Sequence, residues 1–304
     1  MFDEVLIADD DPVSRRLLQV SLSGSGYRVV AVSDGSEALR IMNQEDSPRL
    51  AVLDWMMPSL DGVDVCRSVR RSAREPYVYI ILLTAKGHQT EIIEGLEAGA
   101  DDYIIKPYDL QELKARLRGG KRILELQEQL VSAREQLRMQ ATHDSLTGLL
   151  NRSAILEALE REVVRSYREK HSTAVIMADL DHFKDINDTY GHQAGDSVLQ
   201  ETARRMLASV RSYDFVGRYG GEEFLVVVPS SELAMAVELA ERLRQSISAD
   251  PVNVSGTMIP ITLSLGVATS SPERNQPEQL LHYADDALYE IGRASCRERV
   301  YVLV

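Results

Sequence analysis

Two pairs of neighbouring carboxylates stand next to apolar runs in this sequence, and each pair has the chemistry of a cation site. Asp9 and Asp10 follow the run VLIA (5–8), and Glu222 and Glu223 precede the run FLVVV. Neighbouring carboxylates repel each other unless positive charge lies among them, and oxygen ligands suit Mg²⁺ or Mn²⁺. A divalent cation can in turn support phosphoryl or nucleotidyl transfer. The sequence therefore predicts two acidic sites, one in each half of the chain.

The first pair lies where short apolar runs alternate with helix-like segments. The runs are VLIA (5–8), YRVVAV (27–32), LAVLD (50–54), YIILLT (79–84) and DYIIKP (102–107). Strands separated by helices indicate a parallel sheet with helices on both faces. We therefore predict a doubly wound, five-stranded parallel α/β domain over residues 1–118.

Polar residues fall at the carboxyl ends of these strands, where ligands of an open parallel sheet bind. They are Asp9 and Asp10, Asp54, Thr84 and Lys106. A single aspartate after a strand is often a helix cap. Together the residues predict a site in which Asp54 attacks a phosphoryl donor while Mg²⁺ and Lys106 neutralise the transferred charge.

This set resembles the receiver domain of two-component response regulators over residues 1–118. The resemblance implies that a histidine kinase is the partner and that Asp54 is the phosphoacceptor. It further implies that Asp9, Asp10 and the Met56 carbonyl help to bind Mg²⁺, that Thr84 and Lys106 contact the phosphoryl group, and that Tyr103 is the aromatic switch.

A helical segment at 109–140 follows, and we expect Gly119 and Gly120 to interrupt it. Beyond them, apolar residues recur at alternating spacings of three and four, as in a coiled-coil seam. These are Ile123, Leu126, Leu130, Ala133 and Leu137. We predict that residues 119–140 are a helical coiled-coil linker that pairs two chains. The alternative is one helix packed on its own domain.

The second acidic pair lies where strands and helices do not alternate strictly. We expect helices at 153–170, 194–210, 231–248 and 276–290, strands at 173–181 and 260–269, a polar loop after residue 181, and a hairpin around RYGGEEF (218–224). This pattern indicates an α+β domain with a mixed sheet over residues 141–290.

The hairpin carries the second site. If its neighbour is the strand that ends near Asp179, then Asp179 meets Glu222 and Glu223 across the sheet. Such a carboxylate cluster with divalent metal suits nucleotidyl transfer. Gly220 and Gly221 make the tight turn and let a phosphate or ribose approach the backbone. The alternative is an ordinary Gly-Gly hairpin with solvated glutamates.

Four motifs occur in the order and approximate spacing of the GGDEF domain, whose members are diguanylate cyclases. They are DSLTGLLNR (144–152), DLDHFKDINDTYGHQAGD (179–196), RYGGEEF (218–224) and YADDALY (283–289). The resemblance covers residues 141–290 and implies a fold similar to the palm of nucleotidyl cyclases. It implies that two GTP become cyclic di-GMP and two pyrophosphates. Each domain then supplies half an active site, so catalysis requires a homodimer.

The resemblance also implies residue roles in the acidic site. Asp179, the Leu180 carbonyl and Glu222 would bind Mg²⁺, and Glu222 is the favoured proton acceptor for the 3′-hydroxyl. Glu223 is a further ligand or base. The division of roles between the two glutamates stays open, because neighbouring carboxylates titrate jointly.

Other positions imply recognition of substrate and product. Asn187 and Asp196 match guanine-recognition positions, and Lys184 either lies near the phosphates or is a solvated surface lysine. Arg211 and Asp214 match the family's RxxD product-inhibition site, for which a surface ion pair is the alternative. Arg242 is either a secondary contact there or part of a solvated helix face.

The chain departs from the family pattern after YADDALY. The family lysine that helps to hold triphosphate falls at Gly292, which puts GTP affinity in question. The segment IGRASCRERV (291–300) looks like a translated sequencing adapter. We interpret residues 291–304 as a non-native tail, with a divergent natural terminus as the alternative.

Composition narrows the functional classes. The net charge of −13 and pI near 5.0 disfavour a DNA-binding output. No apolar run is long enough for a membrane span and the start lacks the basic flank of a signal peptide, so we expect a cytoplasmic protein with no membrane insertion. We predict a diguanylate cyclase controlled by phosphorylation of Asp54. The alternative is a catalytically silent sensor that binds cyclic di-GMP through Arg211 and Asp214.

Overall fold

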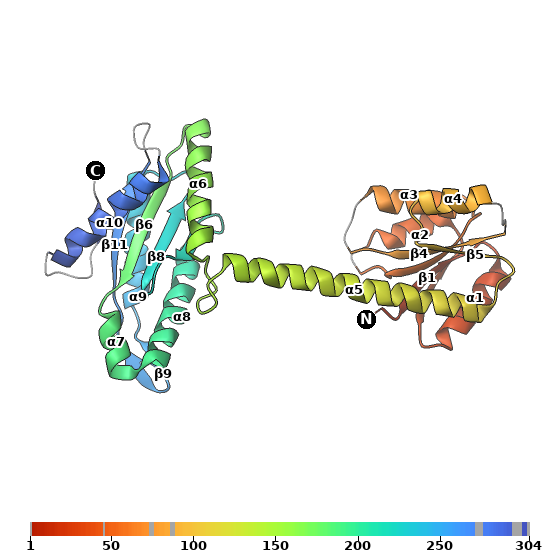
Figure 1. Cartoon of the computed structure of the whole chain (residues 1–304), viewed down its shortest axis with the longest axis horizontal. Helices are drawn as coiled ribbons and strands as arrows, with labels where there is room; N and C mark the ends of the chain where they lie inside the picture. Colours follow the sequence, from red (N-terminus) through yellow and green to blue (C-terminus); the bar gives the residue numbers. More distant parts are fainter. Residues whose placement is uncertain are drawn as a thin grey trace. The chain divides into compact units, whose positions relative to one another are not determined.

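The computed structural model describes residues 2–44, 46–72, 76–85, 89–270, 276–293 and 300–302. The chain divides into two compact units, Met1–Arg134 and Glu135–Val304. Each unit has its own sheet and core (Figure 1). The helix α5 (Leu110–Thr142) contributes residues to both units.

The first unit is built on a parallel sheet with the strand order β2-β1-β3-β4-β5. Every neighbouring pair in it is parallel. This order places the carboxyl ends of β1 and β3 side by side at the edge where ligands bind in such folds. The predicted doubly wound fold is confirmed. The strands are β1 (Glu4–Ala8), β2 (Arg28–Val32), β3 (Leu50–Asp54), β4 (Tyr79–Thr84) and β5 (Asp102–Ile105).

Helices cover both faces of this sheet because alternate side chains of the buried strands point to opposite sides. Leu18 of α1 (Pro12–Ser23) and Leu117 of α5 share a core with Ile7 and Ile81 on one face. The other face packs against α2 (Gly35–Met42) and α3 (Gly62–Arg71). Helix α4 (Gln89–Glu97) approaches Leu82 on that second face through Gly95.

The expected interruption at Gly119 and Gly120 is wrong, because α5 runs through both glycines without a break. The reason is packing. A side chain at Gly120 would overlap the ring of Tyr79 at the start of β4. A helix tolerates a glycine at a cost of about 1 kcal/mol, and here its missing side chain lets the helix lie close against the sheet.

Beyond this contact α5 presents an apolar row to solvent. Leu124 is still fully buried in the first unit, whereas Leu126, Leu130 and Leu137 are 55%, 69% and 65% exposed. The alternative of a helix packed on its own domain thus applies only to the face that carries Leu113, Leu117 and Leu124. The exposed row is the surface that a coiled coil would bury.

The second unit has a mixed sheet with the order β12-β11-β6-β8-β7. Four of these strands pair antiparallel, and β12 pairs in parallel with β11. The predicted mixed sheet is confirmed. The strands are β6 (Ala174–Leu180), β7 (Phe215–Arg218), β8 (Glu223–Val228), β11 (Leu263–Thr269) and β12 (Val300–Val302).

Helices again cover both faces. Helices α6 (Arg152–Glu169) and α10 (Pro277–Arg293) bury apolar residues against one face of the sheet. Helices α8 (His192–Ser209) and α9 (Leu233–Ser248) pack on the other face. A small hairpin of β9 (Val252–Val254) and β10 (Thr257–Ile259) was not expected from the sequence.

The expected polar loop after residue 181 is instead largely helical. Helix α7 (Phe183–Tyr190) occupies it, and Phe183 and Ile186 are its buried residues. These two positions are three apart and so lie on one side of a helix. This single apolar pair within DHFKDINDTY was the only periodic signal available.

The predicted non-native tail is only partly described. Helix α10 extends to Arg293, and Val300 and Val302 pair with Leu265 and Val267 of β11. Residues 294–299 and 303–304 lie outside the described residues. The origin of the tail stays a prediction. Among the described residues, no helix has the length and apolar character to cross a membrane.

Candidate functional sites

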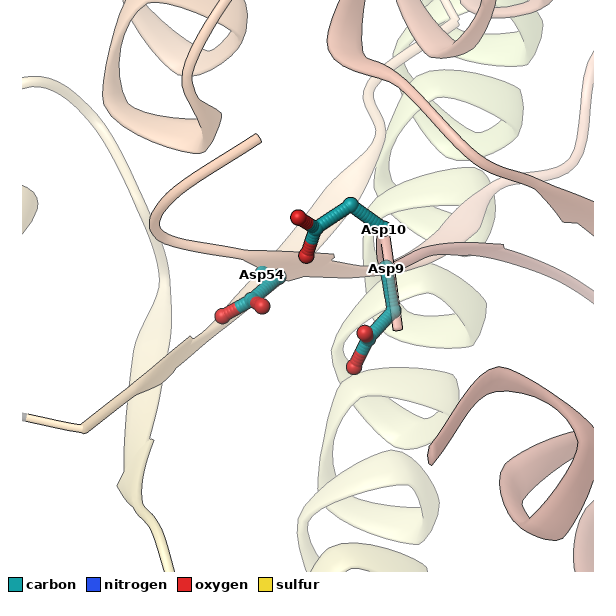
Figure 2. A group of neighbouring side chains, drawn as sticks. All are labelled: Asp9, Asp10 and Asp54. Atoms are coloured by element: carbon teal, nitrogen blue, oxygen red, sulfur yellow. The ribbon is translucent and has the colours of Figure 1, made fainter. Parts of the chain in front are cut away.

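The first acidic site lies at the carboxyl ends of β1 and β3. Asp9, Asp10 and Asp54 each offer a carboxylate oxygen within 4.8 Å of the others (Figure 2). Asp9 is fully buried and Asp10 is exposed. A set of hard oxygen donors open to solvent on one side fits Mg²⁺, which keeps several waters when bound.

Lys106, at the end of β5, lies among these acids. Its Nζ is 2.9 Å from Asp54 Oδ2 and 3.2 Å from Asp9 Oδ2. Burial raises the pKa of the Asp54 carboxyl, and the hydrogen bond from Lys106 opposes this rise only in part. Burial also lowers the pKa of the Lys106 ammonium, but its contacts with Asp54 and Asp9 outweigh that effect and raise it. Lys106 is therefore charged and balances part of the negative charge.

The other predicted receiver residues lie around this cluster. Thr84 is buried at the end of β4, next to β5 in the sheet. Tyr103 is half-buried and packs against the core on the α2 and α3 face. Met56 lies two residues after Asp54 and is 64% exposed. The Lys106–Pro107 peptide is cis.

The second acidic site forms where β6 and β8 end together. Asp179 of β6 is the register partner of Glu223 of β8, and the Leu180 N–H donates to the Glu222 carbonyl over 3.2 Å. The expectation that these acids meet across the sheet is confirmed. The glutamates sit there because β8 starts directly after the turn that contains Gly220 and Gly221.

A cleft of about 650 Å³ opens beside this strand pair. It is lined by Asp179, Leu180 and Glu222, together with Lys184 at the start of α7. Burial raises the pKa of Glu222, and the neighbouring charge of Glu223 raises it further. The carboxylates of Asp179 and Glu222 in this lining are oxygen donors that fit a hard divalent cation.

The two glutamates are not equivalent. Glu222 lines the cleft, whereas the carboxylate of Glu223 lies over Gly220, where any side chain at residue 220 would overlap it. A side chain at Gly220 would have to displace the end of the Glu223 side chain, so the glycine lets that carboxylate lie over the turn. A side chain at Gly221 would meet nothing within 4 Å, so that glycine leaves open space beside the turn.

The contacts of Arg218 that hold this turn, here called the clasp, were not predicted from the sequence. Arg218 donates to the Gly221 carbonyl over 2.7 Å and forms an ion pair of 3.2 Å with Asp144. Burial acts to raise the pKa of Asp144, but hydrogen bonds from Thr147 and the charge of Arg218 outweigh it and lower the pKa. Asp144 lies two residues after α5 ends, so the clasp joins the helix end to the signature hairpin.

A glycine lies beside Asn187, the first of the two predicted guanine-recognition residues. The Asn187 side chain lies against Gly195, at a spacing that no larger residue would permit, and Asp196 follows directly. Gly191 has a positive φ of 83° where α7 passes into α8. The turn lets α7 and α8 pack against each other.

Arg211 and Asp214 lie beside a second, small pocket of about 40 Å³, which Arg242 also lines. Asp214 Oδ2 accepts from the Arg211 backbone N–H, so the pair is joined through the main chain. Asp214 Oδ1 is buried and has no hydrogen-bond partner among the residues that the structure describes. Arg242 donates twice to the Ser209 carbonyl. The pocket thus combines the guanidinium groups of Arg211 and Arg242 with the buried Asp214 Oδ1 acceptor.

Comparisons with known proteins agree with this geometry. The family model described as "Diguanylate cyclase, GGDEF domain" matches residues 141–297, and the response regulator receiver domain model matches residues 5–118. The chain belongs to the GGDEF diguanylate cyclase family. It combines this domain with an N-terminal response regulator receiver domain.

Curated relatives match nearly the whole chain. The response regulator PleD of Caulobacter vibrioides is 32% identical over 298 residues, which are 97% of this chain and 65% of PleD. The diguanylate cyclase DgcP of Pseudomonas aeruginosa is 35% identical over 318 residues, covering 99% of this chain and 45% of DgcP. The chain thus spans less than two thirds of the length of either relative.

Solved structures match the GGDEF half. The coiled coil and GGDEF domain of DgcB from Caulobacter crescentus, in complex with c-di-GMP, is 31% identical with a TM-score of 0.56 and covers 63% of this chain and 99% of that chain. The diguanylate cyclase SiaD of Pseudomonas aeruginosa, in complex with its activator SiaC, is 36% identical with a TM-score of 0.53 and covers 64% and 73%.

Proposed function

We propose that this chain is a diguanylate cyclase whose rate is controlled by phosphorylation of Asp54. It would convert two GTP into cyclic di-GMP and two pyrophosphates. The observation that carries the proposal is the cleft at the end of β6 and β8, which Asp179, Leu180 and Glu222 line together.

Glu222 is the proposed proton acceptor. It takes the proton from the 3′-hydroxyl of one GTP, the freed oxygen attacks the α-phosphorus of the other GTP, and the bond to pyrophosphate breaks. Its raised pKa, caused by burial and by Glu223, supports this role because a more basic carboxylate accepts a proton more readily. Glu223 is the second choice, since it lies over Gly220 and away from the cleft lining.

Asp179, the Leu180 carbonyl and Glu222 would hold Mg²⁺ or Mn²⁺, which supplies positive charge for the leaving pyrophosphate when it is bound. Lys184 would contact the phosphates from the same cleft. Gly220 and Gly221 would leave room for the nucleotide beside the turn. Asn187 and Asp196 would read the guanine through the donors and acceptors of its edge.

A homodimer is required, because each domain holds one GTP and the product contains two. The exposed row on α5 at Leu126, Leu130 and Leu137 supports a parallel helix pair between chains. In this proposal residues 119–140 are the dimerising linker, residues 1–118 the receiver domain and residues 141–290 the cyclase domain.

The receiver domain would accept a phosphoryl group from a histidine kinase. The Asp54 carboxylate attacks phosphorus and the bond to the donor breaks. Mg²⁺ held by Asp9, Asp10 and the Met56 carbonyl would offset the new charge, and Lys106 and Thr84 would contact the phosphoryl oxygens. Tyr103 would be the aromatic switch that responds to the state of Thr84.

Arg211 and Asp214 would bind the product and inhibit the enzyme. The unused Oδ1 of Asp214 supports this assignment, because a buried acceptor without a partner costs free energy that a guanine N–H donor would recover. Arg242 lies in the same pocket and is a second proposed contact.

The test is to incubate the purified chain with GTP and Mg²⁺ and to identify the product by mass spectrometry. We expect cyclic di-GMP from the wild type and none from Glu222→Gln. The Gly292→Lys variant restores the family lysine and should bind GTP more tightly. If neither the wild type nor Gly292→Lys forms product, while cyclic di-GMP still binds and Arg211→Ala abolishes that binding, the chain is a sensor and the enzyme proposal is wrong.

A further inference from the structure

We propose that Asp181 is a positioning residue for the cation of the cyclase cleft. It would fix the position of the segment that carries Asp179 and Leu180. It would also add negative charge next to that segment, without itself being a ligand of the cation. This inference rests on the proposed function, because it concerns the same cleft.

Asp181 is held at both carboxylate oxygens. Ser264 Oγ donates to Oδ1 and Thr262 Oγ1 donates to Oδ2, each over 2.7 Å. The backbone N–H of Asp181 also donates to the Thr262 carbonyl over 3.1 Å. The residue is only 8% exposed, yet it lines the cleft. These contacts tie the end of β6 to β11, so they fix where the Leu180 carbonyl points.

No ion pair to Asp181 is found in the described part of the chain, where its contacts are the two hydroxyls and the Thr262 carbonyl, and the nearby Lys184 lines the cleft without such a contact. A buried carboxylate is costly unless positive charge lies near it. Two hydroxyl donors stabilise the ionised form but do not neutralise it. Asp181 lines the same cleft as Asp179 and Glu222. A divalent cation there would supply the missing charge.

Because hydroxyl donors occupy both oxygens of Asp181, the carboxylate is oriented and not free to turn into the cleft. Its effect on a cation would therefore act through charge and through the placement of its neighbours. Residues that orient metal ligands in this way change metal affinity by about ten- to hundredfold when they are removed.

The experiment measures binding of 3′-deoxy-GTP to the full chain by calorimetry, over a series of Mn²⁺ concentrations. This analogue lacks the 3′-hydroxyl and cannot be cyclised, so binding is read without turnover. It occupies only the nucleotide site, so Mn²⁺ at the receiver site does not enter the signal. We expect Asp181→Asn to raise the Mn²⁺ concentration at half-saturation about tenfold or more, with little change in nucleotide affinity at saturating Mn²⁺.

Ser264→Ala removes one donor and leaves the charge, so its shift should have the same direction and be smaller. Asp188→Asn is the matched control, because Asp188 is an exposed acid on α7, and it should show no shift. An unchanged Mn²⁺ dependence in both Asp181→Asn and Ser264→Ala overturns the inference. Equal weakening of nucleotide binding at every Mn²⁺ concentration, together with a lower Tm, also overturns it, because that result indicates a purely structural role. Failure of the wild type to bind the nucleotide at any Mn²⁺ concentration rejects the proposed function itself.

Discussion

The receiver site and the cyclase cleft both gather carboxylates at strand ends, but they balance the charge in different ways. In the receiver site Lys106 reaches Asp54 and Asp9 within 3.2 Å. In the cyclase cleft the pKa of Glu222 is raised by burial and by Glu223, and the carboxylate oxygens of Asp181 accept from two hydroxyls. In the first site a lysine contacts the carboxylates directly, whereas in the second we propose that a bound divalent cation balances them.

This difference matches the two proposed chemistries. An acceptor that is phosphorylated and dephosphorylated needs a fixed positive charge in both states, which a lysine on β5 provides. A site that binds a metal–nucleotide complex and releases product is better served by a metal ion. The ion's positive charge binds with the nucleotide and dissociates with the product. The two halves of the chain should therefore respond differently to chelators and to loss of a single charge.

The largest effect is expected at the cyclase cleft. Glu222→Gln removes both a proposed ligand and the proposed proton acceptor, so the rate of cyclic di-GMP formation should fall about a thousandfold or more. The control Glu160→Gln changes an exposed acid on α6 in the same way and should leave the rate unchanged. A rate for Glu222→Gln within tenfold of the wild type would contradict the assignment.

The receiver site should be most sensitive to loss of its lysine. Lys106→Met leaves Asp9 and Asp54 buried together without a cation, so the first unit should lose about 3 kcal/mol of unfolding free energy in chelator. Mg²⁺ should restore part of this loss, because it offers a replacement charge. Urea unfolding with and without Mg²⁺ measures both values. Arg71→Met, at an exposed position of α3, is the control. Equal urea-unfolding midpoints for Lys106→Met and the wild type would show that Asp9 and Asp54 need no internal cation.

Disrupting the contact between Gly120 of α5 and Tyr79 of β4 is predicted to have an intermediate effect on stability. Gly120→Ala forces a methyl group against the Tyr79 ring and should destabilise the first unit by about 1–3 kcal/mol. Gly119→Ala is a matched control, because its methyl group meets nothing within 4 Å and should stabilise the helix by about 1 kcal/mol. Thermal unfolding compares the two variants, and equal shifts would show that α5 does not pack as described.

The smallest effect is expected at the clasp between Asp144 and Arg218. The folded pKa of Asp144 lies below its ordinary value of 3.8, so its stabilisation is fully present above pH 3.8 and is lost as the pH falls through the lowered pKa. Asp144→Asn should therefore cost about 1 kcal/mol at pH 7 and progressively less below pH 3.8. Urea unfolding at several pH values tests this, and a cost that grows as the pH falls would have the wrong sign.

The sequence was most informative where a repeating pattern determined the structure. The apolar runs predicted the parallel sheet, and strand ends then located Asp9, Asp10, Asp54 and Lys106. These receiver predictions succeeded because, in a parallel sheet, strand polarity determines which residues share an edge. The pairing of Asp179 with the GG-EE hairpin was predicted only on the condition that the two strands are neighbours, and β6 and β8 meet that condition.

The sequence was least informative where residues far apart in the chain meet. The contact of Asp181 with Thr262 and Ser264, and that of Arg218 with Asp144, depend on which strands become neighbours. Gly120 looked like a helix breaker because its partner, Tyr79, lies on another element. Helix α7 was missed because only Phe183 and Ile186 mark its apolar side.

The most direct test of the account compares initial rates of cyclic di-GMP formation with and without a small phosphodonor. It uses wild type and Asp54→Ala under one set of conditions. We predict that the phosphodonor accelerates the wild type about fivefold or more and leaves Asp54→Ala at the unstimulated rate. If Asp54→Ala proceeds as fast as the phosphorylated wild type, phosphorylation of the receiver does not control the cyclase and the account is wrong.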